Sequence, residues 1–120
     1  MTLAHSTETS IPISEIKAEL FKALAHPARI RVLEVLAAGE RSVSELQPAV
    51  GIEASHLSQQ LGVLRRAGLV VSRKEGTSVY YSIRDRDLIE ILAVARRMLV
   101  TSLSERADLL RDLRAATAEA

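Results

Sequence analysis

Residues 55–60 are rich in side chains that can recognise the edges of nucleic-acid bases. They include Ser55, His56, Ser58, Gln59 and Gln60. A glutamine amide can pair bidentately with an adenine edge, and a serine hydroxyl can reach a base or a phosphate. Surface helices usually carry Glu/Lys pairs, and such pairs are missing between Ser55 and Leu64. The stretch therefore favours contact with DNA over the alternative, an ordinary polar surface.

Basic residues flank this polar stretch on its C-terminal side. They are Arg65, Arg66, Arg73 and Lys74. Their charges suit contacts to phosphates, which position a protein on a duplex without selecting a sequence. Thr77 is expected to add a hydrogen bond along the DNA backbone or minor groove. Residues 26–84 hold eight Lys and Arg against five acids, although the whole chain carries a net charge of only +1. A two-fold dimer would double this regional excess along one duplex.

Other kinds of chemistry find little support in the sequence. The chain has no cysteine, so it forms no disulfide, zinc finger, iron–sulfur cluster or thiol nucleophile. His56 has serine neighbours, but no third residue is evident that would orient it for nucleophilic catalysis. A glycine-rich phosphate loop and a convincing acid–base pair are also missing. We therefore expect a protein that is not an enzyme and uses no cofactor.

The apolar periodicity and the capping signals predict four helices, a hairpin and a further helix. The first helix is expected at about 14–24, and the second begins at Pro27 and is stopped by Gly39. The third begins at Ser42 and is closed by Pro48 and Gly51, and the fourth runs from Glu53 to Ala67. Ser42 with Glu45 three residues later forms a capping box. Residues 69–74 and 78–83 are rich in β-formers and enclose turn residues, which predicts a hairpin. Apolar residues from Leu88 to Leu113 predict the last helix, either continuous or broken near Ser102.

This order of elements is that of a winged helix-turn-helix. A short helix, a tight turn at 48–52 and a second helix with a polar face form the helix-turn-helix, and the hairpin forms the wing. The expected fold class is mainly α with a β-hairpin wing, in the order α-α-α-α-β-β-α.

Four segments resemble the ArsR/SmtB family of bacterial winged-helix repressors. They are LAHPARIRVLEVL (24–36), SVSEL (42–46), LSQQLGVLRRAGLV (57–70) and KEGTSVYYSI (74–83), and they follow one another in the family's order. The resemblance implies a homodimeric transcriptional repressor that binds an inverted-repeat operator through its fourth helix and wing. It also implies a dimer interface between terminal helices, and many members of the family release DNA when they bind a metal.

The sequence departs from the family at both common metal sites. Ser42 and Ser44 stand where one site has cysteines. The other site would fall on Asp85, Asp87, Met98 and Thr101, of which only Asp85 matches the family's residue. The histidines, His5, His26 and His56, show no ligand spacing. Glu105, Asp108 and Asp112 are expected to pair with nearby arginines rather than to hold a metal. We therefore expect no metal site, and the effector stays open.

The apolar stripe of the last helix is wider than one packing partner needs. We expect it to form a homodimer interface together with the first helix. The expected interface residues are Ile16, Leu20, Leu92, Ala95 and Leu99. The alternatives are a single monomeric core for the structure and, for the function, a dimer that serves mainly as a protein–protein interaction module.

The expected organisation is one domain with two extensions. Residues 1–13 would form a flexible tail, 14–100 the DNA-binding and dimerisation domain, and 101–120 a helical extension of that domain. No segment resembles a signal peptide or a membrane anchor, so the protein is expected in the cytoplasm.

Overall fold

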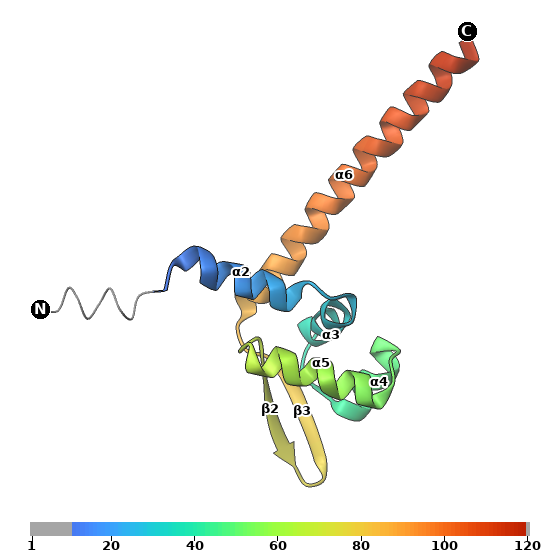
Figure 1. Ribbon diagram of the computed structural model, residues 1–120. Coiled ribbons are helices and arrows are strands. Elements are labelled where there is room, and N and C mark those ends of the chain that lie inside the picture. Colours follow the sequence, from blue (N-terminus) through green and yellow to red (C-terminus); the bar gives the residue numbers. More distant parts are fainter. Residues whose placement is uncertain (1–10, 120) are drawn as a thin grey trace, which may run out of the picture. The chain divides into compact units, whose positions relative to one another are not determined.

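The computed structural model describes residues 11–119, which divide between Asp85 and Arg86 into two compact units (Figure 1). The first unit contains α2 (Ile13–Leu24), α3 (Pro27–Ala37), β1 (Arg41–Ser42), α4 (Val43–Val50), α5 (Ala54–Arg66), β2 (Val70–Glu75) and β3 (Ser78–Ile83). The second unit is the helix α6 (Arg86–Glu119), which continues through Ser102 without a break. This architecture confirms the expected winged helix-turn-helix fold. Most of the expected N-terminal tail, including His5, lies outside the described residues.

The break between α2 and α3 has a local cause in the sequence. His26 is the N-cap of α3, and its Nδ1 accepts a hydrogen bond of 3.1 Å from the backbone N–H of Ala28. Pro27 occupies the first helical turn, where its missing N–H leaves no intrahelical bond unmade. The structure thus confirms that His26 and Pro27 have a structural role at this turn.

The end of α4 differs from the sequence-based prediction. Pro48 and Gly51 were expected to close this helix. Gly51 does so, but Pro48 lies inside the helix, which continues to Val50. A proline there removes one hydrogen bond to the carbonyl four residues earlier. Leu46 and Val50 are both buried, and Gly51 adopts the left-handed conformation (φ +77°) that caps the helix. The backbone N–H of Gly51 donates to the Gln47 carbonyl at 2.9 Å. Burial and capping therefore outweigh the local effect of the proline.

The core of the first unit is aliphatic and is formed mainly by α3, α4 and α5. Its buried side chains include Val32, Leu33, Leu36, Leu46, Leu57, Leu61, Leu64 and Val70. The antiparallel sheet has the order β1-β3-β2. Strands β2 and β3 form the predicted hairpin, which pairs Glu75 with Ser78 around a turn at Gly76 (φ +62°) and Thr77. Strand β1 was not predicted; its two residues pair with Tyr81 and Tyr80.

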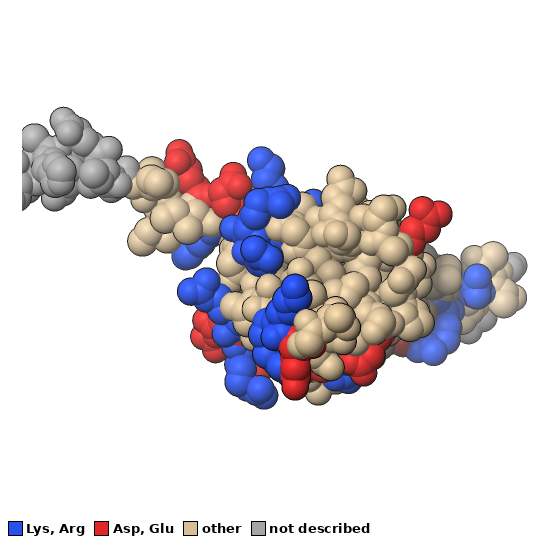
Figure 2. All heavy atoms as spheres, turned by 90° about the horizontal axis from the view of Figure 1, so that it is seen from below, with Lys and Arg blue, Asp and Glu red and all other residues tan. Residues whose placement is uncertain are grey.

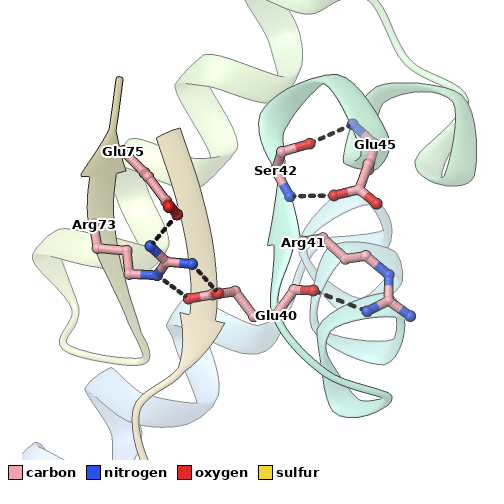
Figure 3. A network of polar contacts seen from close by, with 6 residues as sticks. All are labelled: Glu40, Arg41, Ser42, Glu45, Arg73 and Glu75. Atoms are coloured by element: carbon pink, nitrogen blue, oxygen red, sulfur yellow. Dashed lines mark hydrogen bonds and ion pairs between the residues drawn. The ribbon is translucent and has the colours of Figure 1, made fainter. Parts of the chain in front are cut away.

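The predicted capping box at the start of α4 is confirmed (Figure 3). The Ser42 hydroxyl accepts a hydrogen bond of 3.2 Å from the Glu45 N–H, and the Glu45 carboxylate accepts one of 2.9 Å from the Ser42 N–H. The hydrogen bond from the Ser42 backbone N–H, with a further contribution from the Ser42 side chain, holds the pKa of the Glu45 carboxyl below its usual value. Ser42 is thus both the last residue of β1 and the N-cap of α4.

Loss of this cap should be measurable as a loss of stability. Ser42→Ala is expected to lower the free energy of unfolding by about 0.5–2 kcal/mol, the usual cost of removing an N-cap hydroxyl. Because the folded pKa of Glu45 is depressed, its contribution is present above the unfolded pKa, about 4.3, and is lost as the pH falls through the folded pKa. Urea unfolding at neutral and acidic pH tests both effects. Ser104, which is exposed on α6, supplies the control, Ser104→Ala, and an equal loss in both variants would contradict the assignment.

Candidate nucleic-acid interface

Helices α4 and α5 form the helix-turn-helix, and α5 presents two faces of different chemistry. Gly51 ends α4, and α5 begins three residues later at Ala54. Leu57, Leu61 and Leu64 point into the core and are at most 2% exposed. The exposed residues of the first turns of α5 are Ala54, Ser55, Ser58 and Gln59. A helix anchored by three leucines thus leaves short hydroxyls and one amide at the surface.

Gln60 is a correction to the expected DNA-contacting set. Its side chain is only 5% exposed, and its Oε1 accepts a hydrogen bond of 2.7 Å from the Arg29 Nε. Gln60 lies three residues after Leu57 and four before Leu64, so helical geometry places it on the inward face. That spacing was available in the sequence, whereas the partner on α3 was not. Gln60 therefore connects the two helices, and its amide is not exposed for contact with a base.

The side chain of His56 is less exposed to solvent than those of the serines beside it. It is half-buried, and its ring stands edge-on to the ring of His26, with 5.9 Å between the centroids and an angle of 76°. Both histidines stand out in the sequence, but no local pattern there indicates that they meet. The contact joins the start of α5 to the turn before α3, and a role of His56 in DNA contact stays a prediction.

The basic side chains at the end of α5 and on the wing are exposed. They are Arg65, Arg66, Arg73 and Lys74, and Thr77 is exposed at the wing turn. From the side where this turn lies, the surface shows several Lys and Arg side chains beside a broad uncharged area (Figure 2). A surface of this kind combines cations suited to phosphates with neutral groups suited to base edges.

Arg73 is already paired with carboxylates on two sides (Figure 3). Its Nε and Nη2 donate to the two carboxylate oxygens of Glu40 at 2.9 and 2.7 Å, and its Nη1 donates to Glu75 at 2.8 Å. The guanidinium also lies 4.5 Å from the centre of the Tyr80 ring. Hydrogen bonding and charge from Arg73 hold the pKa of Glu40 below its usual value, and the two carboxylates raise the pKa of Arg73. Arg73 therefore attaches the wing to the residue preceding β1.

The residues expected at a dimer interface differ in their exposure. Ile16 on α2 and Leu99 on α6 are 55% and 63% exposed, and Ala95 is exposed as well. Leu20 and Leu92 are half-buried. Beyond Leu99, α6 exposes further leucines at positions 103, 109, 110 and 113. Asp108 forms an ion pair with Arg111 on this helix, as expected for the C-terminal acids.

Two negative findings apply to the part of the chain that the structure describes. None of its helices is long and apolar enough to cross a membrane. No three of its His, Asp or Glu side chains are grouped so as to hold a metal ion. At the position of the family's cysteine site, Ser42 is engaged in the cap of α4, and the hydroxyl of Ser44 lies 3.1 Å from that of Ser42.

The chain is similar to known DNA-binding regulators over most of its length. A helix-turn-helix domain model matches residues 24–73. The HTH-type transcriptional regulator Rv0081 of Mycobacterium tuberculosis is 57% identical over 107 residues, which cover 88% of this chain and 94% of that protein. Mb0332 of Mycobacterium bovis, whose solved domain is described as that of a possible ArsR-family transcriptional regulator, is 33% identical to this chain. This chain belongs to the ArsR/SmtB family. The crystal structure of Rv0081 superposes with a TM-score of 0.74 at 56% identity, covering 82% of this chain and 99% of that one.

Two proteins besides Rv0081 are similar to this ArsR/SmtB member. A homodimeric winged helix-turn-helix DNA-binding domain, Mb0332 of Mycobacterium bovis, has a TM-score of 0.71 at 33% identity, covering 78% of this chain and 86% of that one. The biofilm growth-associated repressor of Agrobacterium fabrum is 44% identical over 82 residues, which cover 65% of this chain and 70% of that protein. These relatives are regulators of transcription, a class of proteins that are not enzymes.

Proposed function

We propose that this ArsR/SmtB member is a homodimeric repressor that binds an inverted-repeat operator in the cytoplasm. The observation that supports the proposal most strongly is the exposed face of α5. Three buried leucines fix the helix to the core, so that Ser55, Ser58 and Gln59 lie on its outer side. In winged-helix proteins of this order, the second helix of the helix-turn-helix enters the major groove.

The wing and the basic residues complete the proposed binding mode. Arg65 and Arg66 end α5, and Lys74 and Thr77 lie at or beside the wing turn, all of them exposed. These groups would contact flanking phosphates while α5 contacts base edges. Two copies related by a two-fold axis would place their α5 helices in successive major grooves, with half-site centres about 34–36 Å apart or a multiple of that spacing.

The proposed dimer uses apolar residues of α2 and α6. Ile16, Ala95 and Leu99 are exposed in the single chain, and a second copy that covered them would remove their apolar surface from water. We propose residues 14–100 as the DNA-binding and dimerisation domain and 101–120 as its helical extension. The homodimeric state of the related M. bovis domain supports this assembly. Repression would follow if the dimer occupies promoter DNA that polymerase needs.

Mapping the genomic DNA bound by the tagged protein tests the proposal. Its best site, and a shuffled version of equal composition, would then be measured by fluorescence anisotropy over a range of salt concentrations. We expect an inverted repeat, tighter binding to it than to the shuffled duplex, and twice the chain mass by sedimentation. The absence of enriched sites and of salt-dependent binding would favour the interaction module instead.

Lys74 and Arg73 are expected to respond differently to replacement by alanine. Each lost phosphate contact flattens the slope of log K against log salt by about 0.9. Lys74→Ala should show this change, because Lys74 is exposed near the wing turn. Arg73→Ala should flatten the slope less, because Glu40 and Glu75 already neutralise its charge. Both variants should bind every duplex more weakly. Arg111→Ala on α6 is the control, and equal slopes for Lys74→Ala and the parent chain would contradict the assignment.

Metal ions are expected not to release this regulator from its operator. Soft ions need thiolates, and the hydroxyls of Ser42 and Ser44 stay protonated near neutral pH. Borderline ions would need imidazole and carboxylate ligands where Met98 and Thr101 stand. Zinc, nickel, cobalt, cadmium and arsenite should therefore leave the anisotropy of the complex unchanged at micromolar levels. Stoichiometric release that a chelator reverses would contradict this expectation.

A further inference from the structure

A groove of about 540 Å³ lies between α2, α3 and the C-terminal part of α5. Its apolar wall contains Ile16, Leu20, Val63, Ala67 and Leu69. Small-molecule sites in proteins have volumes of roughly 300–1,000 Å³ and combine apolar walls with few polar groups. The size and lining of this groove therefore suit a small molecule with an aliphatic part.

The charged groups of the groove leave an excess of one positive charge. Glu19 and Lys22 line it and form an exposed ion pair at 4.0 Å. Arg29 lines it as well and is half-buried. Its hydrogen bonds go to two neutral oxygens, from Nε to the Gln60 side chain at 2.7 Å and from Nη1 to the Ala23 carbonyl at 3.2 Å. Among the described residues, no carboxylate forms an ion pair with Arg29.

We propose that this groove binds a small amphipathic carboxylate, and that binding releases the protein from DNA. The aliphatic part would lie against Val63 and Leu69, and the carboxylate would pair with Arg29. Carboxylates form stronger hydrogen bonds with guanidinium groups than neutral oxygens do, often through two parallel N–H donors. The second half of the proposal rests on the proposed function.

The coupling to DNA follows from the contact between Arg29 and Gln60. A carboxylate that binds the guanidinium side-on, through Nε and Nη2, would displace the Gln60 amide from Nε. Gln60 is 5% exposed, so the loss of this partner leaves a buried polar group unsatisfied unless α5 moves. Ser58 and Gln59 precede it on the same helix and are exposed for contact with DNA. The ligand and the operator are therefore expected to oppose each other's binding.

A small molecule fits the groove better than a second copy of the chain does. The proposed dimer also uses Ile16 and Leu20, which form part of the groove wall. Its remaining residues, Leu92, Ala95 and Leu99, are all apolar and offer no anion to Arg29. The partner copy would then border the groove and leave the guanidinium to the ligand.

Octanoate is a suitable probe, with octanol and acetate as controls that lack the charge or the tail. Calorimetric titration of the protein without DNA should show saturable binding of octanoate, with both controls at least about tenfold weaker. Arg29→Met should abolish octanoate binding, whereas Lys22→Met, which removes an exposed charge at the same groove, should preserve it. Ala67→Phe should also block binding, since it fills the groove and retains Arg29; this variant serves if Arg29→Met fails to fold.

Three results would overturn the site. Octanol could bind as tightly as octanoate, or Ala67→Phe could bind octanoate as the parent chain does. The third is that octanoate fails to bind the protein when the protein is a dimer. In the presence of operator DNA, octanoate should weaken DNA binding by about fivefold or more, and DNA should weaken octanoate binding by the same factor. Octanoate binding without this effect would overturn the coupling. If octanoate binds as expected but the protein binds no DNA, the proposed function fails and the groove site stands.

Discussion

Leu64→Ala is expected to lower the free energy of unfolding by about 2–5 kcal/mol, the usual cost of removing a fully buried leucine side chain. Leu64 is 0% exposed on the inner face of α5. Its loss removes apolar contacts and leaves a cavity that the surrounding helices fill only in part. Native domains are stable by only about 5–15 kcal/mol, so the variant would lose a large fraction of its stability. Urea denaturation at a fixed protein concentration measures the change.

Leu109→Ala is the matched control for this prediction. It removes the same atoms from a leucine that is 59% exposed on α6. Alanine has at least the helix propensity of leucine, so the folding stability should change by less than about 0.5 kcal/mol. Equal destabilisation by the two substitutions would show that Leu64 has no special role in the core. It would also weaken the argument that buried leucines fix the orientation of α5.

The helices could be predicted well because their signals are local. The first helix was expected at about 14–24 and is found at Ile13–Leu24. The fourth was expected from Glu53 to Ala67 and is found at Ala54–Arg66, with Glu53 and Ala67 as its caps. Apolar spacing and terminal residues lie within one or two turns of the helix that they define. At the end of α4, Gly51 is the cap as expected, but Pro48 does not end the helix because the burial of Leu46 and Val50 outweighs its local effect.

Contacts between distant residues account for the features that were missed. Strand β1 has two residues and exists only because Tyr80 and Tyr81 pair with it. Arg73 and its partner Glu40 are 33 positions apart, and Arg29 and Gln60 are 31 apart. No local pattern specifies such partners, because each depends on how the helices and the sheet pack together. The exposed residues of the candidate interface were predictable from their residue types. The buried and long-range hydrogen bonds that hold α5 and the wing in place were not.

Gln59→Ala is expected to weaken binding to the cognate operator by about 1–3 kcal/mol, the usual contribution of a bidentate contact to a base. Gln59 is exposed on α5, and its amide matches the donor and acceptor pattern of an adenine edge. The variant should bind shuffled DNA as the parent chain does, because phosphate contacts dominate non-specific binding. Its preference at one base pair of each half-site should relax. Anisotropy with single-base variants of the operator measures this change.

Gln60→Ala provides the sharpest comparison, because it removes the same amide from the neighbouring position. Gln60 is buried and bonded to Arg29, so its loss should lower the stability of the fold and weaken binding to all duplexes alike. Gln59→Ala should instead leave the unfolding transition unchanged and act on one base pair. If Gln59→Ala also reduced binding to cognate and shuffled DNA by the same factor, its amide would not contact a base. The outer face of α5 would then act only to position the protein on DNA.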